Sequence, residues 1–398
     1  MSFTGHEPQS PGYRWMLLAL FASGLATFSQ LYSVQGLLPL ISKDLQVSES
    51  QAALSVSAAT LGLALAVIPW AIISDRIGRR QVIVAALICS VAFGLLGTLS
   101  PNVELLLLAR FFEGVALAGV PGTSLAYLAE ELSPRAVALA SGTYIAGTTV
   151  GGLAGRLIAA WVAEPTSWRW GVAAVSISAG IATLFFLLKA PQSQGFSAIT
   201  DRSLKPILRK FAASLSGRRP ILYLQGFLLM GGFVAVYNYL GFRLEAPPYL
   251  IPPAIAALVF VAYLSGTYSS MISGKLVAKL GRKRSLLLGN AAMAAGLLLT
   301  LAGNLWVIIL GMLIFTAGFF AAHAVASGWV PVLAADSRAQ GASLYNLGYY
   351  IGSSLFGWLL GIPFVSHGWP ALVLWVLCLQ TAAALLASLL RDSAGRLR

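Results

Sequence analysis

Residues 51–80 of the chain are QAALSVSAATLGLALAVIPWAIISDRIGRR. Residues 51–74 contain no charged side chain, and the six residues that follow contain three arginines and one aspartate. A helix of about 20 mostly apolar residues is long enough to span the hydrocarbon core of a bilayer. This stretch therefore predicts a membrane-spanning helix that ends in a short basic loop.

The composition of the whole chain extends this prediction. The 398 residues are 58% hydrophobic and only 10% charged, and the mean hydropathy is +0.81. Such a chain has too little polar surface to coat a soluble globule of this size. The formal charge of +13 does not indicate nucleic-acid binding, because the basic residues lie in short loops between apolar segments and form no readable binding motif.

Apolar runs of spanning length recur along the chain, six before residue 190 and six after residue 220. They lie at 14–38, 51–74, 81–99, 104–128, 137–162, 168–189, 221–241, 253–275, 284–303, 305–333, 338–361 and 369–390. We therefore predict an all-α membrane protein with twelve transmembrane helices. The first run lacks a small-residue cleavage site, so we interpret it as a retained helix and not as a signal peptide.

The two halves of the chain contain an internal repeat. Four residues recur 201 positions later: Tyr144, Gly147, Gly151 and Trp168 match Tyr345, Gly348, Gly352 and Trp369. Gly78-Arg79-Arg80 recurs as Gly281-Arg282-Lys283, displaced by 203 positions. The repeat predicts two pseudo-symmetric six-helix halves, 1–189 and 221–398, joined by a linker at 190–220. This architecture suits alternating access, in which one half rocks against the other around a central site.

The basic residues are distributed unevenly between the two sides of the predicted bundle. One side holds 21 of the 26 lysines and arginines, the other side holds Lys43, Arg169 and Arg243, and Arg110 and Arg156 lie within helices. Cytoplasmic loops carry an excess of Lys and Arg. We therefore predict that both termini and the linker are cytoplasmic.

Three segments carry a resemblance to a known family. The loop AIISDRIGRR at 71–80 resembles the signature loop of the major facilitator superfamily. Residues 110–114, RFFEG, are similar to that superfamily's motif in helix 4, and residues 147–152, GTTVGG, are similar to its antiporter motif in helix 5. Together with the twelve-helix plan, the resemblance covers essentially the whole chain and implies the major-facilitator fold.

Within the superfamily, the chain is similar to the twelve-helix drug:proton antiporter group and to YnfM-like inner-membrane exporters. The similarity rests on GGLAGR at 151–156 and FFAAHAVAS at 319–327. It implies a proton-coupled antiporter of the bacterial inner (plasma) membrane that exports small amphipathic organic molecules or drugs. The alternative is an uptake carrier or facilitator of the same fold for a sugar or another small metabolite.

The signature loop supplies the candidate gating residues. Gly78 permits a tight turn, and the charges can form a breakable latch with acidic residues at the cytoplasmic end of helix 4. Glycines in helix 5 allow another helix to approach closely. The gating set is Asp75, Arg76, Gly78, Arg79, Arg80, Glu130, Glu131, Gly147, Gly151 and Gly152. The alternatives are that the arginines only determine topology and that the glycines only pack.

Ionisable side chains inside the predicted helices are the candidates for proton coupling. Burying such groups in hydrocarbon is expensive, so each needs a partner or a function. The candidates are Glu113, Arg110, Arg156 and His323. Glu113 can take up a proton when its cationic neighbour moves away, because loss of that neighbour favours the neutral carboxyl. The alternatives are a purely structural ion pair and, for His323, an ordinary hydrogen-bonded helix contact.

Polar and aromatic residues near the outer ends of helices 1 and 7, with two residues of helix 11, are candidates for a substrate cavity. Aromatic faces suit the body of an amphipathic molecule and amides suit its polar group. The set is Gln30, Tyr32, Gln35, Asn238, Tyr239, Tyr345 and Asn346. The tyrosines have the alternative role of interfacial anchors, whereas amides are rare as anchors.

No enzymatic motif stands out in the sequence. There is no Walker-type phosphate loop, no Cys/His cluster at metal spacing and no credible nucleophile motif. We therefore expect no catalytic residue, no metal and no cofactor, and we disfavour a membrane-embedded enzyme or receptor. The expected partners are a small-molecule substrate, protons and the lipid bilayer, without nucleic acid, and we expect a monomer.

Overall fold

The computed structural model describes residues 5–8, 10–198 and 205–392, so the ends of the chain and part of the predicted linker lie outside the described residues. The described chain is helical apart from short connections and one isolated β-bridge between His6 and Leu132. The helices before the linker are α1 (Pro11–Leu31), η1 (Gln35–Leu37), α2 (Leu38–Leu45), α3 (Glu49–Ile77), α4 (Arg79–Thr98), α5 (Val103–Leu117), α6 (Pro121–Glu131), α7 (Pro134–Ala163) and α8 (Trp168–Lys189).

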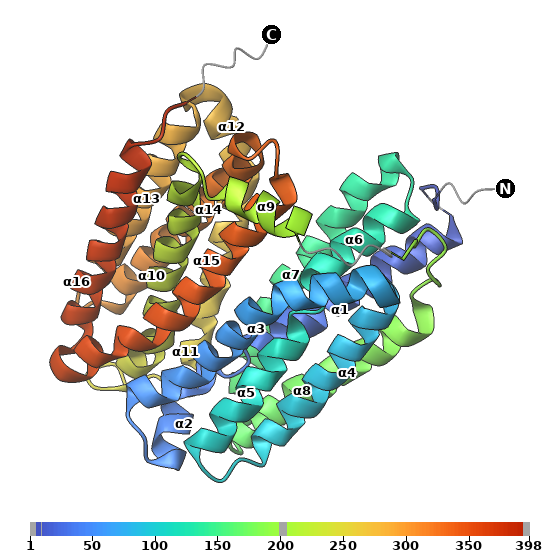
Figure 1. Cartoon of the computed structure of the whole chain (residues 1–398). Coiled ribbons are helices and arrows are strands. Elements are labelled where there is room, and N and C mark those ends of the chain that lie inside the picture. The colour runs from blue at the N-terminus through green and yellow to red at the C-terminus, as the bar shows by residue number, and fades with distance from the viewer. Residues whose placement is uncertain (1–4, 9, 199–204, 393–398) are drawn as a thin grey trace. The chain divides into compact units, whose positions relative to one another are not determined.

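A second series of helices follows, coloured from yellow-green to red in Figure 1. They are α9 (Lys205–Ser214), α10 (Arg219–Glu245), α11 (Pro253–Ala256), η2 (Ala257–Ala262), α12 (Tyr263–Leu280), α13 (Arg282–Leu299), α14 (Leu305–Leu333), α15 (Arg338–Leu359) and α16 (Gly361–Ser388). Helical segments cover each of the twelve apolar runs of the sequence. Nine stretches of helix in the described chain are long and apolar enough to cross a membrane. The all-α prediction is therefore confirmed, while the count of twelve stays a prediction.

The predicted helices differ from the observed ones mainly where proline or glycine interrupts the backbone. The run at 104–128 is divided into α5 and α6 just before Pro121, whose ring has no N–H to continue the helix. α16 extends from Gly361, but its backbone is non-helical at Gly368, where φ is +73°, so the helix of the last predicted run begins just after this kink. Proline and glycine thus mark the positions at which helices are divided.

Contacts between residues group the described helices into two compact units. The first contains α1–α8 together with the short helix α11, and the second contains α9, α10 and α12–α16. The sequence-based boundaries at 189, 190–220 and 221 are not tested by this grouping and stay a prediction.

Within the first unit, α1 packs closely on α7. A Cβ atom added to Gly147 would lie 2.4 Å from the backbone oxygen of Phe21, and one added to Gly151 would lie 2.4 Å from that of Leu25. These distances leave no room for a side chain, so glycine is what allows the two backbones to approach.

The second unit repeats this arrangement between α10 and α15. A Cβ atom added to Gly352 would lie 2.0 Å from the backbone oxygen of Phe227. The loops that precede α4 and α13 also match, because Gly78 and Gly281 both have positive φ, +106° and +82°, which glycine tolerates. The internal repeat is therefore present in the backbone as well as in the sequence.

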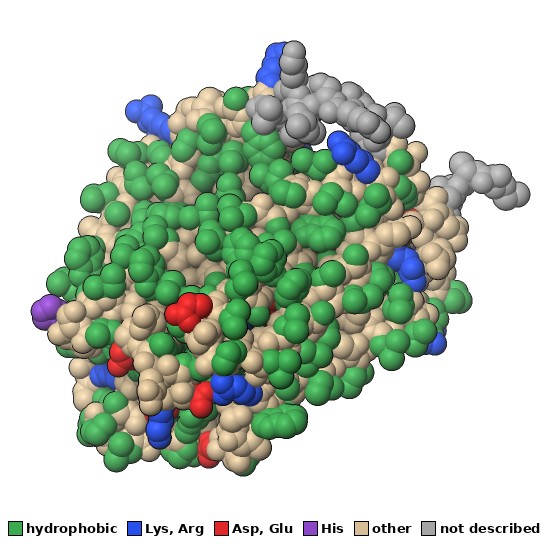
Figure 2. Space-filling model, turned by 60° about the horizontal axis from the view of Figure 1, so that its bottom comes forward, with side chains coloured by type: hydrophobic (Ala, Val, Ile, Leu, Met, Phe, Trp, Pro, Cys, Tyr) green, Lys and Arg blue, Asp and Glu red, His purple; other side chains and the backbone are tan. Residues whose placement is uncertain are grey.

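The surface of the chain is strongly apolar. Leu99, Met271 and Trp306 are each at least 75% exposed. Figure 2 shows hydrophobic side chains spread across a whole face, with few charged groups among them. Exposed apolar area of this extent is typical of a surface that contacts lipid.

Candidate functional site

The centre of the first unit contains an arginine that caps the end of a helix. Because α1 ends at Leu31, the carbonyl groups of its last turn have no partners within the helix. Arg110 of α5 donates to the backbone oxygens of Gln30 and Leu31, at 3.1 and 2.6 Å, and to that of Ser55 on α3, at 3.3 Å. The negative end of the α1 dipole further favours a cation at this position.

Glu113 lies one turn further along α5 and pairs with the same arginine. Its Oε2 atom accepts from Arg110 Nη1 at 2.5 Å, and each of the two side chains is 1% exposed. A buried ion pair is strongly destabilised when one partner is removed, because an uncompensated charge remains. Here Arg110 donates to three backbone oxygens besides the carboxylate, so Glu113 is not its only hydrogen-bond acceptor.

Small polar groups surround this pair. Gln30 of α1 donates from Nε2 to the Oγ atom of Ser90 on α4, at 3.0 Å. Ser176 of α8 comes close to Gly94 of α4, since a Cβ atom on that glycine would lie 2.6 Å from its Oγ atom. Ser90, Gly94 and Ser176 could not be predicted from the sequence, because serine and glycine are common throughout transmembrane helices and no pattern distinguishes these three.

Arg156 of α7 forms a second polar cluster in the first unit. Its Nε atom donates to Oε1 of Gln35 at 2.8 Å, and Nη1 donates to the backbone oxygen of Gly152. Its guanidinium lies 4.5 Å from the centre of the Tyr32 ring, a cation–π distance. The structure thus brings a proton-coupling candidate together with two cavity candidates.

In the second unit, His323 of α14 contacts α15. Its Nδ1 atom lies 2.8 Å from the hydroxyl of Tyr345, and its ring is 5.0 Å from that of Tyr349. Asn238 and Tyr239 of α10 both donate to the backbone oxygen of Gly357, at 3.0 and 3.1 Å. Asn346 is exposed in the second unit. In the second unit, three of the predicted cavity residues therefore lie in helix contacts, and the fourth, Asn346, is exposed.

A cluster of aromatic side chains, which the sequence pattern did not predict, lies next to His323. The rings of Phe233 on α10 and Phe319 on α14 are stacked with centroids 3.9 Å apart. Five further rings of α10, η2, α12 and α14 surround them: Tyr237, Phe260, Tyr263, Phe315 and Phe320. Their spacing in the sequence is that of ordinary apolar helices, so only the packing of four elements reveals the cluster.

The signature loop forms a charge cluster at one end of the first unit. Gly78 makes the turn between α3 and α4, and Arg79 pairs with Asp75 at 2.5 Å and with Glu130 of α6 at 2.9 Å. Arg76 is exposed beside them. Because one guanidinium bridges two helices through two carboxylates, separation of α3 from α6 would break at least one ion pair.

A short segment after α8, residues 190–196, is held against the same end of the unit. We call it the strap. Arg80 donates to the backbone oxygens of Leu187 and Ala190, at 2.8 and 3.3 Å. Glu131 accepts from the backbone N–H groups of Gln194 and Gly195, at 2.8 and 2.9 Å. Two gating candidates, Arg80 and Glu131, therefore contact the start of the predicted linker and take no part in the ion pairs of Arg79.

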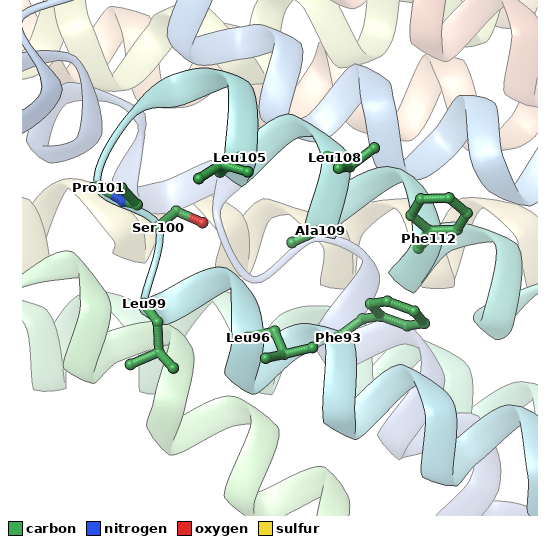
Figure 3. Close-up of a pocket in the computed structure, with 9 residues that line it drawn as sticks. All are labelled: Phe93, Leu96, Leu99, Ser100, Pro101, Leu105, Leu108, Ala109 and Phe112. Carbon is green, nitrogen blue, oxygen red and sulfur yellow. The ribbon is translucent and has the colours of Figure 1, made fainter.

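An apolar groove of about 340 Å³ lies between α4 and α5. Figure 3 shows Phe93 and Phe112 close together at one end and Leu99 and Pro101 at the other. The two phenyl rings are stacked with centroids 5.5 Å apart. None of the predicted cavity residues lines this groove. It has no charged group to fix a polar ligand, so its chemistry suits hydrocarbon.

The chain is similar in sequence to known membrane transporters. A family model described as Major Facilitator Superfamily matches residues 16–269. The inner membrane transport protein YnfM of Escherichia coli is 37% identical over 361 residues, covering 90% of this chain and 86% of that protein. The uncharacterized MFS-type transporter YybF of Bacillus subtilis is 35% identical over 369 residues, covering 92% and 90%.

Solved structures with the same fold include two transporters. The nucleoside transporter NupG superimposes with a TM-score of 0.75 at 14% identity, covering 94% of this chain and 98% of that one. A bacterial homologue of the human lysosomal transporter Spinster, in an inward-facing and occupied conformation, gives a TM-score of 0.77 at 16% identity, covering 96% and 97%. At these identities, the likeness concerns the fold alone.

Proposed function

This chain belongs to the major facilitator superfamily and is a multi-pass membrane transporter, and from that premise we propose that it is a proton-coupled antiporter that exports small amphipathic organic molecules by alternating access. The proposal adds three things to the family assignment: the driving ion, the direction of transport and the class of substrate.

The observation that carries proton coupling is the bonding of Arg110. Its guanidinium donates to the carboxylate of Glu113 and also to three backbone oxygens. Glu113 can therefore be neutralised by a proton without leaving Arg110 as an unsatisfied buried charge. A carboxyl with two accessible charge states, placed among helices that move, is what coupling requires.

The signature-loop charges support alternating access. In our proposal, Arg79 with Asp75 and Glu130 forms a latch that stabilises the conformation in which α3 and α6 are held together. The close backbone contacts at Gly147 and Gly151 give α7 and α1 a smooth surface along which small displacements are possible. The latch then contributes to one state of the transport cycle and not to the other.

The side chains around Arg156 in the first unit support an amphipathic substrate. Tyr32 brings an aromatic ring and Gln35 an amide to this guanidinium. An apolar molecule with one polar group matches these few polar groups better than a sugar, which needs many hydrogen-bond partners at once.

The function can be tested in proteoliposomes with purified protein. A pH gradient is imposed, and the accumulation of dyes, drugs, nucleosides and sugars is measured in each orientation of the gradient. We expect accumulation of amphipathic compounds against their gradient, driven by proton movement in the opposite direction. Accumulation of a sugar or nucleoside in the same direction as protons, without transport of the amphipathic compounds, would instead establish the uptake carrier.

A further inference from the structure

The side-chain amide of Gln30 has a defined orientation. Its Nε2 atom lies 3.3 Å from the backbone oxygen of Ala26 and 3.0 Å from the Oγ atom of Ser90. A backbone oxygen only accepts, and Ser90 uses its own hydroxyl proton on the backbone oxygen of Leu87, at 2.9 Å. Both neighbours therefore require the NH₂ group of the amide on this side.

The other end of the amide is an acceptor without a donor. Gln30 is fully buried, and its Oε1 atom has no hydrogen-bond partner among the described residues. Buried polar atoms are almost always hydrogen-bonded, so each exception calls for an explanation. A donor that is present in only one state of the protein is one such explanation.

The carboxyl of Glu113 lies next to this acceptor. A Cβ atom on Gly94 would be 3.2 Å from Gln30 Oε1 and 3.3 Å from Glu113 Oε1, so the two oxygens converge on the same point of α4 from α1 and α5. Glu113 Oε2 is the oxygen that accepts from Arg110. Oε1 is thus the oxygen on which a proton can be placed while Oε2 still accepts a hydrogen bond from Arg110; the carboxyl is then neutral, and the contact is no longer an ion pair.

We propose that Gln30 Oε1 is the hydrogen-bond acceptor for the protonated carboxyl of Glu113, so that Gln30 is a positioning residue that stabilises the proton-loaded state. The inference rests on the proposed proton coupling through Glu113. A proton that binds Oε1 forms an O–H group, which donates to Gln30 Oε1. When that proton leaves, the carboxylate forms its ion pair with Arg110 again, and Gln30 Oε1 again lacks a donor.

Other charged groups of the packed helices lie away from this point. Arg110 is the cation in contact with Glu113. α1 packs on α7 and α8 as well as on α4 and α5. On α1, α3, α4, α5 and α8, the remaining charged side chains of the described chain lie in the first or last turn: Arg14, Glu49, Asp75, Arg76, Arg79, Arg80, Glu104, Arg169 and Lys189. Arg156 lies within α7, where it donates to Gln35 and to the backbone oxygen of Gly152. Cys89 of α4 is exposed. Among the described residues of these helices, Glu113 is therefore the carboxyl that lies away from the helix ends.

The test is infrared difference spectroscopy of the purified full-length protein during a pH titration. The C=O stretching band of the protonated carboxyl is assigned by its loss in Glu113→Gln. We expect Gln30→Met to move this band to higher wavenumber, because the hydrogen bond is lost. Its midpoint should move to lower pH by about one unit, a tenfold loss of proton affinity.

The matched control is Gln225→Met in the second unit. Gln225 is also fully buried, its Nε2 atom donates to the backbone oxygen of Ala383, and its Oε1 atom likewise lacks a partner among the described residues. This control should leave the band and its midpoint unchanged. If Gln30→Met does not fold, Gln30→Asn retains an amide but withdraws its oxygen, and the same shifts are expected.

The inference is overturned if Gln30→Met or Gln30→Asn titrates with the wild-type band and midpoint while Glu113→Gln removes the band. Failure of the proposed function gives a different result, because the wild-type protein would then accumulate no compound of the transport panel under a pH gradient. The spectroscopic measurement does not depend on any substrate, so the two failures are distinguishable.

Discussion

At the scale of single residues, the chemistry of the first unit depends on how Arg110 divides its hydrogen bonds. Three go to backbone oxygens, which no substitution of a neighbouring side chain removes, and one goes to Glu113. The charge of Glu113 can therefore change while the arginine stays bound to the three backbone oxygens.

We predict that Glu113→Gln abolishes accumulation driven by a pH gradient but retains substrate binding. Glutamine keeps the size of the side chain and an acceptor for Arg110, but it cannot exchange a proton. The ratio of internal to external substrate should therefore fall to about 1, as expected when binding persists without coupling. Wild-type accumulation in this variant would make Glu113 a structural counter-ion, and His323 would then be tested in the same way.

A second residue-scale prediction concerns the latch. Asp75→Asn removes one of the two ion pairs of Arg79 and leaves the one with Glu130. A partly exposed ion pair contributes about 1 kcal/mol, so turnover should fall by about fivefold if the pair forms in one state only. Thermal stability in detergent should change little. The control is Glu104→Gln, which neutralises an exposed carboxylate outside the gating set. Equal turnover in Asp75→Asn and in this control would argue against a gating role.

At the scale of elements, the helix pairs α1–α7 and α10–α15 are held together by glycine contacts. At Gly147, Gly151 and Gly352, a backbone oxygen of the facing helix lies directly against the glycine. A helix pair of this kind tolerates little added volume, because protein interiors are closely packed.

We predict that Gly151→Ala destabilises the protein, because the new methyl group would lie 2.4 Å from the backbone oxygen of Leu25. Overpacking of this kind costs about 1–3 kcal/mol, measured as a lower unfolding temperature in detergent. Gly142→Ala on the same helix is the matched control, since nothing lies within 4 Å of its added Cβ atom. Equal stability of the two variants would contradict the packing argument.

The strap is the other element-scale feature that can be tested. Glu131→Ala removes the carboxylate that accepts from Gln194 and Gly195. We expect limited chymotrypsin digestion to cut after Phe196 at least about tenfold faster, because each hydrogen bond to a charged group contributes about 1.5–3 kcal/mol. Mass spectrometry of the fragments measures the cut. Glu104→Ala at the start of α5 is the control, and an unchanged rate in Glu131→Ala would mean that the carboxylate does not hold the strap.

At the scale of the whole molecule, the distribution of charge predicts which end of the helices faces the cytoplasm. The uneven distribution of 21 basic residues against 3 predicts that the end with the signature loop and the strap is cytoplasmic. We therefore propose cytoplasmic termini and a cytoplasmic linker for this multi-pass membrane protein.

This orientation can be tested by cysteine accessibility. Cys89 and Cys378 are replaced by serine, and single cysteines are introduced at Gln192 in the strap or at the exposed Thr166 between α7 and α8. A membrane-impermeant maleimide should label Thr166→Cys in intact cells and Gln192→Cys only after the cells are opened. The reverse pattern would overturn the topology.

The helical class, the internal repeat and the turn at Gly78 could be predicted from the sequence. They depend on local properties: the length of an apolar run, the spacing of glycines and the freedom of glycine to form a tight turn. Local chemistry also identified Glu113, Arg110 and Arg156 as ionisable groups inside helices, because a charge within an apolar run is visible without any knowledge of packing.

The hydrogen-bond partners of these groups are apparent only from the packing of the helices. Arg110 donates to the carbonyls of Gln30 and Leu31, about 80 positions away, and Arg156 donates to Gln35, 121 positions away. A backbone oxygen has no identity in a sequence, and the unsatisfied Oε1 atom of Gln30 is apparent only when every neighbour is placed. The physical reason is that hydrogen bonding depends on the distance between atoms in space, and helix packing brings together segments that lie far apart along the chain.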